Sequence, residues 1–205
     1  MKNTIVLAAV AGIASAAAAQ SGSLTLVPSV TTIDSSVSTS FTMSVYANAD
    51  FGTHIAGGAF SLANAGGAGI VTDMDFASVG WGEGGENDRG HDADGNYTGV
   101  VFGQIIIPAF NLQPSPDSAI DGDVFVGSFM VTIAAGSEGL IDWTTGVDGI
   151  SPFVLEIYDA GDESSTSLLN GDFDGHGGAR VNVVPAPSAL ALLGLGGIAA
   201  GRRRR

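Results

Sequence analysis

The chain has 205 residues, no cysteine and a formal net charge of −14 at pH 7. The absence of cysteine excludes disulfides, thiolate metal sites and cysteine nucleophiles. Residues 20–183 contain all 21 acidic residues but only two basic ones, Arg89 and Arg180, which gives this part a formal charge of −19. Such a charge repels nucleic acids and anionic membrane surfaces, and it argues against both as partners of this part.

The first 19 residues have the pattern of a secretory signal peptide. Met1 and Lys2 form a positive start, and residues 5–14 form an apolar segment. Ala17 and Ala19 are the small residues expected before a cleavage site, which places the cut ahead of Gln20. We therefore expect a signal helix at residues 1–19 that is removed during export.

Residues 20–169 have the patterning of a β-sheet domain. Apolar side chains alternate with hydroxyl side chains from residue 36 to residue 47, and residues 100–107 are almost all apolar. A second alternation places five residues on one face of a strand: Phe125, Gly127, Phe129, Val131 and Ile133. Shorter candidate strands cover residues 24–27, 55–62, 70–76, 140–143, 153–158 and 180–184. Period-two alternation with glycines between the strands predicts an all-β fold, an antiparallel β-sandwich.

One long polar stretch, residues 80–99, separates two of these candidate strands. Asp92, Asp94 and Asn96 have the alternating spacing of oxygen ligands in the first half of a calcium loop. Tyr97, however, stands where such a loop requires glycine. A solvated loop is the favoured interpretation, a Ca²⁺ site is the second, and carbohydrate contact through Trp81 or Tyr97 is the third.

A second acidic stretch, residues 170–183, follows the expected domain. Asn170, Asp172 and Asp174 match the start of an EF-hand-type calcium loop, but Val181 stands where the loop needs glutamate. We favour an acidic, glycine-rich spacer that ends in a last strand, and we keep calcium binding open as the alternative.

Sequence motifs for catalysis are missing. His54, His91 and His176 are dispersed, and the sequence contains no G-x-S-x-G, P-loop or H-E-x-x-H motif. We therefore predict a protein without enzymatic activity and without a cofactor, apart from the calcium alternatives.

The last 22 residues have three parts in order. Four residues form a stiff leader because each proline restricts the backbone: Val184, Pro185, Ala186 and Pro187. Residues 188–201 are uncharged and mostly apolar, and four arginines close the chain: Arg202, Arg203, Arg204 and Arg205. An apolar segment followed by arginines is typical of a membrane segment with a cytoplasmic stop. Residues 188–201 are fewer than the roughly 20 that span a bilayer, so this short helix suits an anchor that is held until cleavage.

Residues 184–205 resemble the PEP-CTERM sorting signal of exported bacterial proteins, with Ala186 where that signal usually has glutamate. The resemblance implies processing by an exosortase-type membrane protease and delivery to the cell surface or to an exopolysaccharide matrix. The strand order, with its segments 57–62 and 122–129, also resembles a cohesin-like jelly-roll sandwich. We therefore expect an exported, non-enzymatic surface or matrix protein that is attached to the membrane, transiently or permanently, through its C-terminus. The alternative is a calcium- or glycan-binding module that uses residues 80–99.

Overall fold

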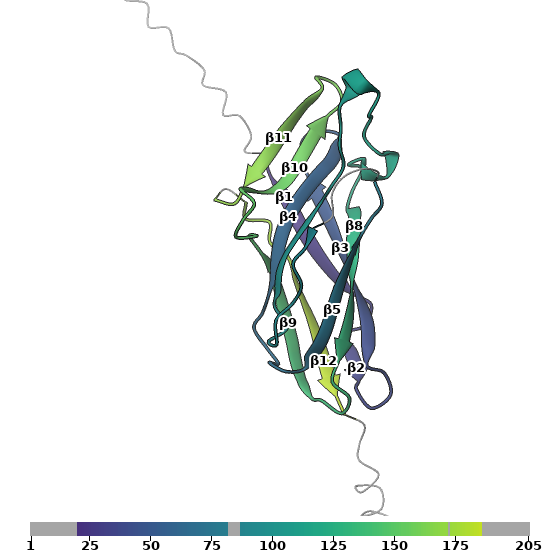
Figure 1. Ribbon diagram of the computed structural model, residues 1–205, viewed down its shortest axis with the longest axis vertical. Coiled ribbons are helices and arrows are strands. Elements are labelled where there is room, and N and C mark those ends of the chain that lie inside the picture. Colours follow the sequence, from purple (N-terminus) through teal and green to yellow (C-terminus); the bar gives the residue numbers. More distant parts are fainter. Residues whose placement is uncertain (1–19, 82–86, 172, 186–205) are drawn as a thin grey trace, which may run out of the picture.

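The computed structural model describes residues 20–81, 87–171 and 173–185. The expected signal helix and the expected apolar helix of the tail lie outside these ranges. Within them the regular structure consists of β-strands and two short 3-10 turns, η1 (Pro108–Phe110) and η2 (Pro116–Ser118). The strands form two sheets that pack on one another in an elongated molecule (Figure 1).

The smaller sheet is fully antiparallel and has the order β1-β3-β8-β5. Its strands are β1 (Gly22–Pro28), β3 (Ser40–Ala49), β8 (Val124–Ile133) and β5 (Val71–Ser78). Inward-facing residues of β3 are fully buried, while the serines and threonines between them face outward, as the alternation predicts.

The larger sheet has the order β11-β10-β4-β9-β12-β2. Its strands are β11 (Ser164–Leu169), β10 (Phe153–Asp159), β4 (His54–Asn64), β9 (Gly139–Gly146), β12 (Gly178–Val184) and β2 (Thr32–Asp34). In addition β7 (Tyr97–Gly103) pairs with β4, and β6 (Asn87–Asp88) pairs with β7. The long strand β4 pairs with β10 near its start and with β9 near its end. The β12–β2 pair is parallel, so the sandwich is mostly, but not wholly, antiparallel.

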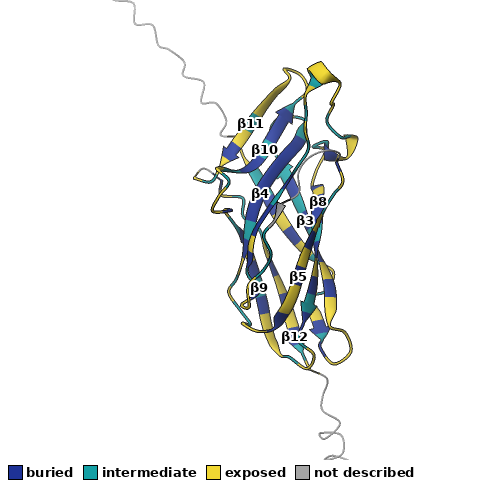
Figure 2. Ribbon diagram, in the orientation of Figure 1, coloured by how far each residue is buried: buried dark blue, intermediate teal, exposed yellow. Residues whose placement is uncertain are grey.

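Aromatic rings fill much of the space between the sheets. Phe60 of β4 lies with its ring centroid 6.1–6.2 Å from those of Phe76, Phe102 and Phe129, all in edge-on geometry. Such pairs stabilise a core beyond the area they bury. Buried residues run along the strands of both sheets (Figure 2). The prediction of an all-β sandwich is confirmed.

A β-bulge in β8 changes the face that one predicted core residue occupies. Val45 pairs with Gly127, but the next residue of β3, Tyr46, pairs with Phe125. The extra residue, Val126, is fully buried, and Phe125 turns outward, where 39% of it is exposed and its ring packs on that of Tyr46. A one-residue shift exchanges the two faces of a strand. The prediction that Phe125 shares the buried face of Phe129 is therefore wrong.

Two predicted strands are shorter than their apolar patterns suggest. The strand predicted over residues 100–107 ends at Gly103, and Ile105 and Ile107 beyond it are 47% and 39% exposed. The alternation predicted from residue 36 begins only at Ser40, because Val37 lies in a turn and is 82% exposed.

The stretch predicted as a spacer, residues 170–183, belongs to the sandwich. Phe173 is buried, and the carbonyl of Gly175 accepts a hydrogen bond from the Leu24 amide of β1 at 2.8 Å. Residues 178–184 then form β12, which lies between β9 and β2. The folded domain therefore extends to Val184 rather than to residue 169, because apolar and backbone groups of this stretch join the two sheets.

Candidate functional site

The end of β12 is where the folded domain meets the tail. Val183 is 1% exposed and pairs with Ile33 of β2 on one side and with Gly139 of β9 on the other. The next residue, Val184, is the first of the predicted sorting residues and still belongs to the strand. Pro185 follows directly and is exposed. The remaining sorting residues lie outside the described residues: Ala186, Pro187, Arg202, Arg203, Arg204 and Arg205.

A buried serine holds the end of β12 in place. The backbone amide of Ser35 donates to the carbonyl of Val184 at 2.9 Å, and its hydroxyl donates to the carbonyl of Ser137 at 2.7 Å. The same hydroxyl lies 3.4 Å from the Val184 carbonyl oxygen. Ser35 has no exposed surface. We call Ser35, Ser137 and Val184 the exit clamp, because these three residues meet where the chain leaves the sandwich.

The described chain begins in the upper part of Figure 1 and ends at the bottom. The predicted cleavage residues Ala17 and Ala19 lie outside the described residues, whereas Gln20 is described and exposed. Ser21 donates from its amide and its hydroxyl to the two carboxylate oxygens of Asp50, at 2.8 and 3.0 Å. These bonds stabilise the charged form and lower the pKa of Asp50. They attach the first residues of the body to the end of β3.

The aromatic residues proposed to bind carbohydrate face the core instead. Trp81 is 7% exposed and Tyr97 is 1% exposed. The Trp81 ring packs edge-on against Phe102 at 6.2 Å, and the Tyr97 ring packs against Phe129 at 4.9 Å. Because burying large rings stabilises a sandwich core, these residues serve the fold, and the prediction that they form a carbohydrate surface is wrong.

Asp92, Asp94 and Asn96 form a tight turn. Both carboxylate oxygens of Asp92 are used: Oδ1 accepts from the amides of Asp94 and Asn96 at 2.9 and 3.0 Å, and Oδ2 accepts from the Asn96 side chain at 2.9 Å. The side-chain bond from Asn96 is the main cause of a lowered Asp92 pKa. Asn96 in turn accepts a hydrogen bond from the Asn64 amide at 2.7 Å, which ties the turn to β4.

Calcium binding at either predicted loop stays a prediction. In the second predicted loop, Asp172 lies outside the described residues and Asp174 is exposed. The side chain of Asn170 donates a hydrogen bond to the Ser151 carbonyl at 2.7 Å. Over residues 20–81, 87–171 and 173–185 the structure contains no group of three or more acidic or histidine side chains placed to hold a metal ion.

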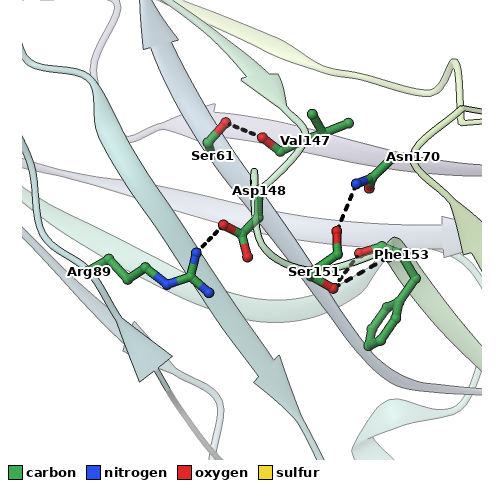
Figure 3. Close-up of polar contacts among 7 residues, drawn as sticks. All are labelled: Ser61, Arg89, Val147, Asp148, Ser151, Phe153 and Asn170. Carbon is green, nitrogen blue, oxygen red and sulfur yellow. Dashed lines mark hydrogen bonds and ion pairs between the residues drawn. The ribbon is translucent and has the colours of Figure 1, made fainter.

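Both arginines of the body form ion pairs with aspartates on or just after β9. Arg89 contacts the 1%-exposed Asp148, and Figure 3 shows it reaching across from a neighbouring segment. Arg180 of β12 donates to both carboxylate oxygens of Asp142 at 3.0 and 2.8 Å. The bonds from Arg180 lower the pKa of Asp142. The sequence shows only that residues 20–183 contain two arginines and no lysine. It does not show which carboxylates these arginines contact.

The three histidines contact different parts of the sandwich. His54 lies beside the Thr53 hydroxyl at 2.9 Å, His91 beside Asp73 at 3.2 Å and His176 beside the Thr145 hydroxyl at 3.2 Å. Burial lowers the pKa of His54 and of His176, because it penalises the charged imidazolium. The ring of His176 also packs edge-on against Phe173 at 4.8 Å.

No helix within the described residues is both long enough and apolar enough to cross a membrane. The apolar part of the tail, residues 188–201, is not among them.

Comparison with known proteins identifies the tail. Residues 183–205 match the PEP-CTERM protein-sorting motif, which confirms the resemblance seen in the sequence. This motif implies an exported protein that is sorted through its C-terminus by exosortase processing. No curated protein matches the chain.

Two solved cohesins are similar to the body in fold. The seventh ScaB type I cohesin of Pseudobacteroides cellulosolvens is 11% identical, with a TM-score of 0.49, over 81% of this chain and 96% of the cohesin. The non-cellulosomal cohesin of Archaeoglobus fulgidus is 10% identical, with a TM-score of 0.38, over 82% of this chain and 96% of that one. The chain joins a two-sheet β-sandwich to a PEP-CTERM sorting motif.

Proposed function

We propose that this chain is a non-enzymatic protein of the cell surface or the extracellular matrix, delivered there through exosortase-type processing of its tail. The observation that carries the proposal is the junction at Val184. The matched sorting motif begins at residue 183, inside the last strand of the sandwich, so the sorted cargo is the sandwich itself.

The use of charged residues supports a structural rather than a chemical role. Arg89 and Arg180 are both committed to ion pairs that hold β9 and its following loop. Asp92 is committed to a turn. The remaining acidic surface keeps copies of the body soluble and apart, which suits a protein displayed at high density or embedded in a matrix of exopolysaccharide.

The proposal is tested by following the chain in its native host with and without the exosortase-type enzyme. In the intact host the body should appear in the surface or medium fraction. In a strain that lacks the enzyme, or with the double variant Pro185→Ala and Pro187→Ala, it should stay in the membrane fraction with its tail attached. Equal distribution in all three cases would contradict the proposed function. A variant with Asp117→Asn, on an exposed loop far from residue 184 in the sequence, serves as the control and should behave like the unaltered chain.

A further inference from the structure

The sandwich leaves almost no space between itself and the sorting tail. β12 is hydrogen-bonded through Val183 to β9 and through Val184 to β2. Only Pro185, Ala186 and Pro187 separate Val184 from the apolar segment that begins at Ser188. Even fully extended, this leader spans at most about 14 Å. A membrane-embedded enzyme that handles the tail must therefore work directly against the end of the folded body.

Three turns surround this exit. The exit clamp is formed by the connections at residues 35–39 and 134–138, and the turn at residues 65–70 joins them through a hydrogen bond from the Ala134 amide to the Ile70 carbonyl. Two acidic residues border the exit: Asp34, which pairs with Val184, and Glu138, which follows Ser137.

We propose that the exit clamp places the processed bond on the C-terminal side of Pro185, an inference that rests on the proposed function. Processing breaks one amide: a nucleophile of the enzyme, and finally water or an amine, takes the acyl group, and the nitrogen leaves as a free amine. The carbonyl of the Val184–Pro185 amide accepts the hydrogen bond from the Ser35 amide. Attack there, or at any earlier bond of β12, first requires the strand to separate from β2 and β9.

Protection of these bonds is measured directly by proteolysis of the signal-processed full chain with proteinase K, followed by intact mass. Cleavage of a strand follows the population in which it is open. The resistant product of the unaltered chain should end beyond residue 184. Ser35→Ala removes one hydroxyl of the clamp and should raise the rate of cuts within residues 178–184 about fivefold, the effect of losing one net hydrogen bond.

Ser38→Ala is the matched control, since the Ser38 hydroxyl is exposed and bonds only the nearby Ser40 carbonyl among described contacts. It should leave the cleavage pattern unchanged. Products of the unaltered chain that end within residues 178–184, or equal rates for Ser35→Ala and Ser38→Ala, would overturn the proposal.

The position of the natural cut is then read from the C-terminal peptide of the body recovered from the native host. The proposal expects an end at Pro185 or later, and an end at or before Val184 overturns it. A chain that keeps Arg205 contradicts the proposed function instead, and the proteinase K comparison still decides whether the clamp protects the strand.

Discussion

The two arginines of the body show how the position of a residue decides what an ion pair contributes. Asp148 is almost completely buried, so its charge depends on Arg89 for compensation. The Arg180 side chain is 73% exposed, and water competes for its pairing with Asp142. The same pair of residue types therefore has two different energetic roles in one molecule.

Replacing Arg89 by methionine should lower the free energy of unfolding by about 3–5 kcal/mol, because it leaves a buried carboxylate without its partner. Chemical denaturation monitored by tryptophan fluorescence measures the change. The matched variant Arg180→Met should change stability little, since that pair is exposed. Combining Arg89→Met with Asp148→Leu should recover most of the loss. An equal effect of the two single variants would contradict this assignment.

Histidine burial predicts a decline in stability on mild acidification. The native state lowers the pKa of His54 and His176 below the ordinary value of 6.5, so the unfolded chain binds protons first as pH falls. Stability should therefore decrease as pH falls from 6.5 through the native pKa values of these histidines. The pKa values of Asp50, Asp92 and Asp142 are lowered in the native state. Their contribution to stability is therefore lost only when the pH falls below 3.8, the ordinary pKa of aspartate.

The test is the urea midpoint at about pH 7.5 and about pH 5.5 for the unaltered chain and for His176→Gln. His176→Gln should flatten the dependence on pH, whatever its effect on absolute stability. Ser38→Ala, which changes no titratable group, is the control and should leave the slope as it is. An undiminished slope in His176→Gln would show that this imidazole does not contribute to it.

At the scale of elements, period-two alternation was sufficient to place most strands along the sequence. It was not sufficient to predict which residues of each strand face the core. β4 lies where its apolar pattern predicts, and β3 begins four residues later than its pattern, at Ser40. Phe125 faces outward because the bulge at Val126 exchanges the two faces of β8. A Cβ on the next residue, Gly127, would lie 2.4 Å from the Phe76 ring. Local alternation cannot reveal a contact with another strand, and so the reversal could not be predicted.

The same limit applies to residues 170–183. Composition alone favours a spacer, because glycine and aspartate are poor strand formers. The structure packs this stretch so closely that a Cβ on Gly175 would lie 1.9 Å from the Gly22 carbonyl oxygen. These glycines therefore permit the close approach of two backbones, a role that the sequence does not distinguish from flexibility.

Gly175→Ala should consequently reduce stability by more than about 2 kcal/mol, because backbone atoms rather than a flexible side chain would have to move. Gly171→Ala, only four residues earlier, should be nearly neutral, since a Cβ there meets nothing within 4 Å. Thermal unfolding of the two variants side by side provides the comparison. Similar melting temperatures for both would contradict the close packing of residues 173–177 on β1.

At the scale of the whole molecule, the C-terminal tail was the most predictable part and the contacts of the body the least. A sorting pattern is local in sequence, so residues 184–205 could be interpreted without a fold. The exit clamp joins Ser35 to Val184 across 149 residues, and Arg89 meets Asp148 across 59. Such contacts depend on the order of strands in the sheets, which alternation does not specify.

The most direct test of the central claim is the intact mass of the protein recovered from its native host, with cells and medium kept separate. The account predicts a body that lacks residues 1–19 and the arginine cluster and that keeps the sandwich through Val184. A membrane-bound chain that retains Arg202 to Arg205 would contradict sorting through the tail and leave a simple anchored surface domain.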